Sequence, residues 1–250
     1  TVVFSGAGGL MELLLSPILD ALPLPKEDRA RNMSMLHSFF AWGQIFDVLV
    51  TTSLLALLGS EGWRIIVSCW AAVPLLSCAF FTLVPMNPRV KPGNEMPIRA
   101  LFRNRIFRLA MLAILFGGAA EVTMAQWASA FIDRALHLPK LVGDTLGVCG
   151  FSFMLALGRT LYGLRGKADG IHRLMILGSI GAMACYLIAA LSASPIVSLI
   201  ACALTGLCVS LLWPGSVIVA SGHLPLAGAS MFALLSAMGD TGASLASFVT

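Results

Sequence analysis

Long apolar runs separated by short polar connectors dominate the chain. A helix needs about 20 residues to cross a bilayer, and eight runs approach or exceed that length. They cover residues 1–22, 34–58, 63–85, 107–131, 143–163, 173–193, 195–220 and 226–250. The runs are too long for strands and do not alternate between apolar and polar positions. The sequence therefore predicts an all-α polytopic membrane protein with eight transmembrane helices.

The composition agrees with a lipid environment. Hydrophobic residues make up 58% of the 250 residues, charged residues make up 11%, and the mean hydropathy is +0.90, whereas about a quarter of the residues in soluble domains are charged. These values exclude a soluble globule, a disordered chain, a coiled coil and a disulfide-rich module. The net charge of +4 does not indicate nucleic-acid binding, because the basic residues lie in a few connectors between apolar runs.

The connectors differ in charge. Twelve of the 16 lysines and arginines lie in or beside the first, third and fifth connectors, and three lie in or beside the second, fourth and sixth. Because short basic loops stay on the cytoplasmic side of a membrane, we predict that the odd connectors are cytoplasmic, including the long one at 86–106. We expect a multi-pass protein of the cell (plasma) membrane, with both ends of this chain on the outer side.

Two pairs of apolar runs share a pattern at nearly one spacing. Gly9-Leu10, Leu14-Leu15 and Pro17 match Gly206-Leu207, Leu211-Leu212 and Pro214 at 197 residues, and Ser34-Met35 with Gly43 match Ser230-Met231 with Gly239 at 196 residues. This indicates two duplicated bundles of parallel topology. Residues 1–85 are then the last three helices of the first bundle, 86–106 the cytoplasmic loop between the bundles, and 107–250 the first five helices of the second. The complete protein would have two halves of six helices.

Several short motifs lie within these runs. They are Gly6-Ala-Gly-Gly-Leu-Met-Glu12 with Ser16-Pro17; Asn32 with Leu36-His37-Ser-Phe-Phe40 and Gly43; Gly118-Ala-Ala-Glu121 with Trp127; Leu212-Trp213-Pro214-Gly215; and Gly163-Leu-Arg165-Gly-Lys167-Ala-Asp169-Gly170 with Arg173. The last is similar to a degenerate form of the cytoplasmic loop signature of the major facilitator superfamily. The first four resemble helices four, five, seven and ten of its fucose/galactose/glucose–proton symporter group. The resemblance covers helices four to eleven of twelve.

Four acidic residues fall near the middle of apolar runs: Glu12, Asp47, Glu121 and Asp240. A charge at the bilayer centre costs about 2.5–3.5 kcal/mol on insertion scales, so such residues are expected to face a polar cavity or a partner. Glu12 shares a helical face with Ser5 and Ser16, and the resemblance implies a membrane carboxylate at this position. We predict that Glu12 is the proton-coupling residue. The alternative is a permanently neutral acid that is hydrogen-bonded to a neighbouring helix.

Polar residues on three runs are candidates for solute binding. They are His37, Gln44 and Asp47 on the second run, Glu121, Gln126 and Trp127 on the fourth, and Asp240 on the last. Asp240 follows Gly239 as Gln44 follows Gly43 in the repeat, which predicts matched polar positions from the two halves. The alternatives are hydrogen bonds between helices for Gln44 and Asp47, an interfacial position for His37, and packing for Trp127.

The fourth run poses a geometric question. Glu121 and Gln126 point about 140° apart on a regular helix, so both reach one cavity only if the helix unwinds, for which Gly117-Gly118 offers a place. On the next run, Arg159 is predicted either to extend to the membrane surface or to pair with Asp169, as a gate or a structural clamp.

These patterns predict a secondary active transporter that moves a small polar solute, in the class of sugars, by alternating access with proton coupling. The expected partners are that solute, protons and the lipid bilayer, and we expect no cofactor, metal or nucleic acid. A membrane enzyme does not fit, because the sequence has no HExxH motif and no convincing pair of catalytic aspartates. A solute receptor or scaffold on a transporter fold is the remaining alternative.

Overall fold

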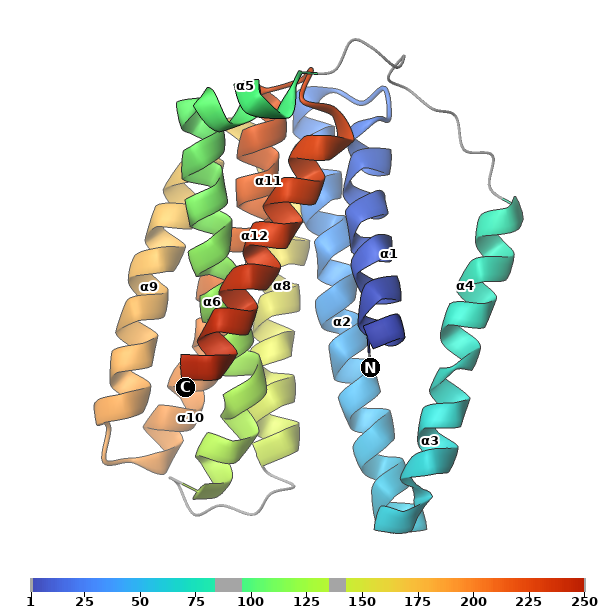
Figure 1. Ribbon diagram of the computed structural model, residues 1–250. Coiled ribbons are helices and arrows are strands. Elements are labelled where there is room, and N and C mark those ends of the chain that lie inside the picture. Colours follow the sequence, from blue (N-terminus) through green and yellow to red (C-terminus); the bar gives the residue numbers. More distant parts are fainter. Residues whose placement is uncertain (1, 84–95, 135–142, 250) are drawn as a thin grey trace.

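The computed structural model describes residues 2–83, 96–134 and 143–249 (Figure 1). Within these ranges the chain is helical and contains no strand. The helices are α1 (Val2–Asp20), α2 (Lys26–Leu58), α3 (Trp63–Trp70), α4 (Ala72–Leu83), α5 (Ile98–Arg103), α6 (Arg105–Arg134), α8 (Cys149–Arg165), α9 (Ile171–Leu191), α10 (Pro195–Val209), α11 (Leu212–His223) and α12 (Gly228–Val249), with short η1 (Ser60–Gly62), η2 (Gly143–Val148) and η3 (Ala168–Gly170). The predicted all-α fold is confirmed.

Each predicted membrane run contains at least one helix. Six segments of the described chain combine the length and the hydropathy needed to cross a bilayer: Lys26–Leu58, Trp63–Leu83, Arg105–Asp133, Thr145–Arg165, Ala168–Leu191 and Pro195–His223. The multi-pass membrane character is therefore confirmed. The helices α1 and α12 occupy the other two predicted runs but are not among the six, so the count of eight spans stays a prediction.

Helix α2 begins earlier than the apolar run on which it was predicted. It starts at Lys26 rather than at residue 34, directly after Pro25. A proline before the first turn and acidic side chains within it, here Glu27 and Asp28, both favour a helix start. The basic residues of the predicted first connector, Lys26, Arg29 and Arg31, therefore project from the first turns of α2. Likewise, the predicted loop at 86–106 contains the short helix α5 after Pro97, and its first part lies outside the described residues.

Two predicted spans are each divided into two helices. The run at 63–85 is broken after Trp70, and the run at 195–220 is broken after Val209. A proline lacks the N–H that would donate to the carbonyl four residues earlier, and Pro74 and Pro214 leave the carbonyls of Trp70 and Ser210 in this position. Proline alone does not decide the outcome, since Pro17 lies inside α1 without ending it.

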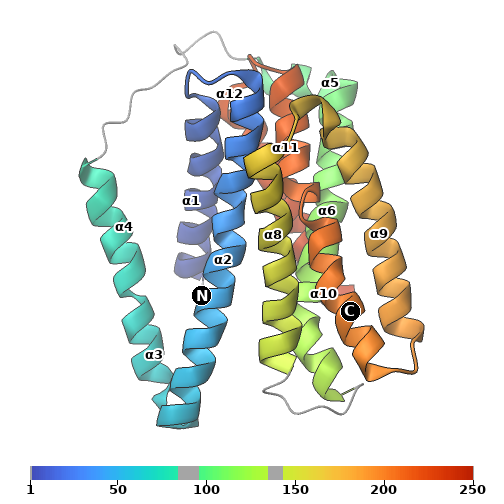
Figure 2. The same ribbon diagram turned by 180° about the vertical axis from the view of Figure 1, so that it is seen from behind.

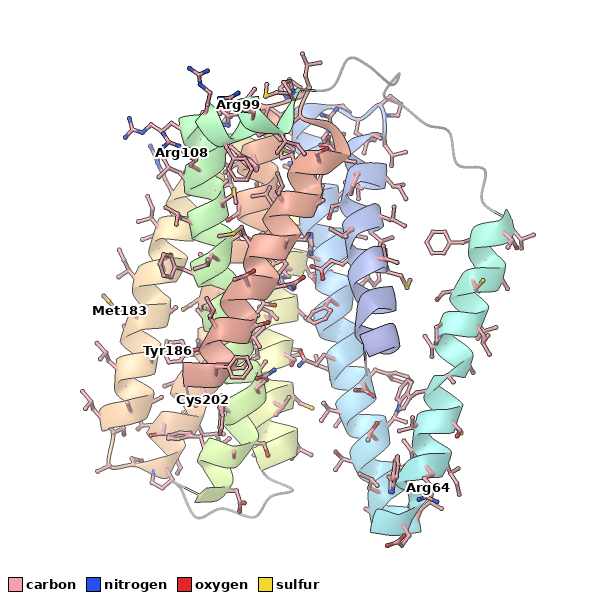
Figure 3. All side chains as sticks on the ribbon, viewed as in Figure 1. Arg64, Arg99, Arg108, Met183, Tyr186 and Cys202 are labelled. Carbon is pink, nitrogen blue, oxygen red and sulfur yellow. The ribbon has the colours of Figure 1, made fainter. Side chains whose placement is uncertain are left out.

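The helices run up and down in one bundle with an outlying pair (Figures 1 and 2). Helix α12 packs along α6, α2 packs along α8, and α10 lies between α8 and α9. The pair α3–α4 stands apart from the bundle in both views and is attached to it beside the end of α2. Arg99 and Arg108 lie at the end that carries α5, and Arg64 lies at the opposite end (Figure 3).

Candidate solute cavity

A partly open cavity of about 610 Å³, which we call the central cavity, lies between helices of the bundle. Six helices contribute to it: α1, α2, α6, α8, α11 and α12. Its titratable lining residues are Glu12, His37, Glu121, Arg159 and Asp240. The structure therefore brings together five of the predicted functional residues, from segments that are far apart in the sequence. Three carboxyl groups and one guanidinium face this cavity.

Arg159 and Glu121 form an ion pair at the cavity wall. The Nη2 atom of Arg159 lies 2.6 Å from Oε2 of Glu121, and the two side chains are 2% and 9% exposed. Two charges at this depth need each other as well as further hydrogen bonds, because taking either out of water is costly. The pair joins α6 to α8 and neutralises one of the three carboxylates.

The other nitrogens of Arg159 bind main-chain carbonyls. Nε donates to the carbonyl of Ser210 at 2.9 Å, and Nη1 donates to the carbonyl of His37 at 3.1 Å. Pro214 cannot supply the N–H that the Ser210 carbonyl would receive in a continuous helix, so Arg159 takes the place of that donor. In return, the Ser34 hydroxyl donates to the carbonyl of Arg159 at 2.8 Å. One side chain thus connects α2, α6 and the break between α10 and α11.

The predicted pairing of Arg159 with Asp169 is wrong. Asp169 lies in η3, beyond the end of α8, and its carboxylate is 2.8 Å from Nζ of Lys26. Two further bonds join the same segments: the Ala168 N–H donates to Oε2 of Glu27 at 2.7 Å, and Nε of Arg31 donates to the carbonyl of Gly166 at 2.8 Å. We call these three contacts between α2 and residues 166–169 the end latch. Arg159 is buried deeper in the bundle and is occupied by Glu121.

Glu12 and Asp240 line the cavity from α1 and α12, which pack against each other. Ser16 lies on the same side of α1 as Glu12, as predicted, and its Oγ is 3.5 Å from Nε2 of His37. His37 therefore lines the cavity rather than the membrane surface. The side chain of Ser5, the third member of the predicted stripe, lies outside the described side chains.

Gln44 and Asp47 do not line this cavity. Oε1 of Gln44 accepts a hydrogen bond from the Ser152 hydroxyl of α8 at 3.0 Å. Oδ1 of Asp47 accepts one from the Thr51 hydroxyl at 3.2 Å. For Gln44 this is the alternative considered above, a hydrogen bond between helices.

Gln126 and Trp127 also lie away from the cavity. Oε1 of Gln126 accepts a hydrogen bond from the Ser247 hydroxyl of α12 at 2.7 Å. Trp127 lines a separate groove of about 400 Å³ together with Tyr186 and Cys202, which lie on α9 and α10 (Figure 3). Helix α6 continues through Gly117 and Gly118 without unwinding, so Glu121 and Gln126 diverge as a regular helix requires.

Trp213 lines the site although it was not among the predicted functional residues; it belongs to the motif Leu212-Trp213-Pro214-Gly215. The indole lines the central cavity and is 7% exposed. Its six-membered ring lies against Gly239 of α12 and Gly118 of α6, where a Cβ atom would collide with it. The Nε1–H group is buried and has no hydrogen-bond partner in the described part of the chain. A buried donor without a hydrogen-bond partner is costly. The contacts with Gly118 and Gly239 hold the indole ring beside the cavity.

Within the described ranges, no three His, Cys, Asp or Glu side chains form a group that could hold a metal ion. None of the six cysteines, all of which lie in the described ranges, is joined to another by a disulfide.

The comparison with protein families agrees with a helical membrane protein. The family model of the Major Facilitator Superfamily matches residues 2–248, so the chain belongs to that superfamily. Its members are secondary membrane transporters rather than enzymes. A search of the curated proteins finds no match to the chain.

Proposed function

We propose that this chain belongs to a proton-coupled symporter for a hydroxyl-rich solute in the class of sugars. The observation that carries the proposal is the central cavity, where Glu12, Glu121 and Asp240 meet beside Arg159. Under the proposed domain division, Glu12 comes from the first bundle and the other three residues from the second. A solute held between bundles that rock against each other is the general arrangement of alternating access.

Each lining residue has a chemical role in this proposal. Glu12 has no basic partner within hydrogen-bond distance in the described chain, and it binds and releases the coupling proton. The carboxylates of Asp240 and Glu121 accept hydrogen bonds from solute hydroxyl groups, and His37 and the indole of Trp213 complete the lining. We assign no contact with the solute to four of the predicted residues, because their side chains lie outside the central cavity in this conformation: Gln44, Asp47, Gln126 and Trp127.

The proposed gate has two parts. Arg159 holds the interior, because it binds Glu121 on α6 and the His37 carbonyl on α2. The end latch, which includes Asp169, holds the end of the bundle that carries the predicted cytoplasmic connectors. Both parts connect α2 to α8 or its following turn, so both have to break when the bundles separate at this end. In this proposal eight helices span the plasma membrane, and the loop at 86–106 is cytoplasmic.

The test is transport by the full-length protein in proteoliposomes with an imposed proton gradient. We expect uptake of a labelled sugar against its concentration gradient. Glu12→Gln should abolish accumulation and retain exchange of labelled for unlabelled sugar, because exchange needs the cavity but no net proton movement. Asp47→Asn is the matched control and should accumulate sugar normally. Gradient-driven accumulation by Glu12→Gln would contradict the coupling role. Binding without flux would favour the receptor alternative.

A further inference from the structure

A second cavity lies at the end of the bundle that carries the end latch. It has a volume of about 220 Å³ and shares no lining residue with the central cavity. The first turns of α2, the segment η3, the start of α9 and the last turns of α11 enclose it. Its charged and imidazole side chains are Lys26, Arg29, Asp169, His172 and His223. We call it the end cavity.

Arg29 is incompletely bonded at the wall of the end cavity. Its Nε is buried and has no hydrogen-bond partner in the described part of the chain. Nη2 donates to the carbonyl of Leu24 at 3.3 Å, and Nη1 is 3.9 Å from Oδ1 of Asp20, which is beyond hydrogen-bond distance. A guanidinium has five N–H donors in a fixed plane. An acceptor with several oxygen atoms would satisfy the donors that the protein leaves free.

Further donors surround the same space. The rings of His172 and His223 are 6.2 Å apart, centre to centre. Nδ1 of His223 is 2.9 Å from the carbonyl of Val219; because a carbonyl only accepts, Nδ1 carries a proton, and Nε2 is a second donor in the imidazolium form. Lys26 is held by Asp169, but both side chains are largely exposed, so that ion pair is weak and exchangeable.

The backbone adds to the attraction for an anion. Both α2 and α9 begin at the end cavity, at Lys26 and Ile171, and the N-terminal end of a helix carries partial positive charge. The volume is several times the roughly 30 Å³ that one water molecule occupies in the liquid, which leaves room for a tetrahedral anion. The acidic groups nearby are Asp169, bound to Lys26, Asp20, which faces Arg29, and Glu27, which accepts a hydrogen bond from the N–H of the lining residue Ala168.

We propose that the end cavity binds a phosphate group, carried either by a soluble phosphate or by the headgroup of an anionic lipid. The phosphate oxygens accept hydrogen bonds from Arg29 on α2, from His172 on α9 and from the imidazolium form of His223 on α11. The bound group therefore connects α2 to α9 and α11. Its effect on transport, which rests on the proposed function, is to hold this end of the bundle closed.

Binding is tested directly with inorganic phosphate. The full-length protein is placed in nanodiscs of phosphatidylcholine, and phosphate is titrated while heat release and thermal unfolding are measured. We expect saturable binding that Arg29→Gln weakens by about tenfold or more, as the loss of a charged hydrogen-bond donor would. His223→Gln, at an exposed position, is the second variant in case Arg29→Gln does not fold. Arg108→Gln, an exposed arginine at the same end but outside the cavity, is the control and should bind normally.

A second arm identifies the source of the phosphate group. Nanodiscs that contain phosphatidylglycerol are examined without free phosphate. Stabilisation by this lipid that is lost in Arg29→Gln and retained in Arg108→Gln supports a lipid headgroup, whereas saturable binding of inorganic phosphate in neutral nanodiscs supports a soluble ligand. The proposal is overturned if neither probe binds, or if binding is the same in Arg29→Gln and His223→Gln as in the unchanged protein. Because binding is measured without flux, failure of the site and failure of the transporter proposal remain distinguishable.

Discussion

Arg159 donates from Nε to the carbonyl of Ser210 over 2.9 Å, in place of a main-chain N–H that the chain lacks at Pro214. The same guanidinium is paired with Glu121 at 2.6 Å. A backbone break and a buried carboxylate therefore depend on one side chain. This dependence makes the stability of the bundle and the chemistry of its cavity inseparable at Arg159.

Loss of Arg159 should destabilise the protein strongly. Arg159→Gln leaves the Glu121 carboxylate buried without a counter-charge, and breaking a buried pair in this way costs about 3–5 kcal/mol. The measurement is thermal and denaturant unfolding of the full-length protein in detergent. The double variant Arg159→Gln/Glu121→Gln removes both charges and should be more stable than Arg159→Gln alone. Equal stability of the single variant and the unchanged protein would contradict the pairing.

Pro214→Ala should reduce the dependence on Arg159. The alanine supplies the N–H that the Ser210 carbonyl lacks, so a continuous helix can form across the break. We therefore expect Arg159→Gln to cost less in the Pro214→Ala protein, with a coupling energy in the range of about 0.5–3 kcal/mol. A double-mutant cycle of unfolding free energies measures it. Strict additivity would show that Arg159 does not complete the helix.

Asp240 should matter for solute affinity, whereas Asp47 should not. Asp240→Asn removes a charged acceptor from the cavity lining, and a hydrogen bond to a charged group contributes about 1.5–3 kcal/mol, so the dissociation constant for the solute should rise about tenfold or more. Asp47→Asn alters a carboxylate that binds Thr51 outside the cavity. Solute-dependent thermal shifts of the two variants decide between them, and equal shifts would remove Asp240 from the site.

A side chain at Gly239 should disturb the cavity through Trp213. In Gly239→Ala the new Cβ overlaps the indole ring, and such overpacking typically costs about 1–3 kcal/mol. Gly43, the counterpart of Gly239 in the predicted repeat, has nothing within 4 Å of an added Cβ, so Gly43→Ala should be nearly neutral. Unfolding of the two variants is compared under one condition. A neutral Gly239→Ala would mean that the ring is not held by this glycine.

The apolar runs predicted where the helices lie, because burying a helix in lipid requires length and hydropathy that the sequence displays directly. They did not predict where α2 begins, because its first turns contain charged residues and therefore lie outside the apolar run. The start signal was local: Pro25 followed by Glu27 and Asp28. The break at Ser210 was likewise marked only by Pro214, inside an otherwise continuous apolar run.

The residues of the candidate site were likewise only partly predictable from the sequence. Glu12, Glu121 and Asp240 were identifiable because a carboxyl group is costly at mid-membrane depth. The partner of Arg159 was not, because Glu121 is 38 positions away on another helix, and only the tertiary packing brings the two together. Trp213 gave no signal of its own, since an aromatic residue in an apolar run resembles ordinary packing. The repeat predicted a matched role for Gln44, but α8 supplies Ser152 as its partner instead.

Helix α11 extends from one cavity to the other. Trp213, near its first residue, lines the central cavity, and His223, its last residue, lines the end cavity. The helix has 12 residues and a length of about 18 Å. The indole of Trp213, in its first turn, packs against Gly118 of α6 and Gly239 of α12. A displacement of α11 as a rigid body would therefore change the lining of both the central cavity and the end cavity. If occupancy of one cavity changes the affinity of the other cavity for its ligand, thermodynamic linkage requires that occupancy of the second cavity changes the affinity of the first by the same factor.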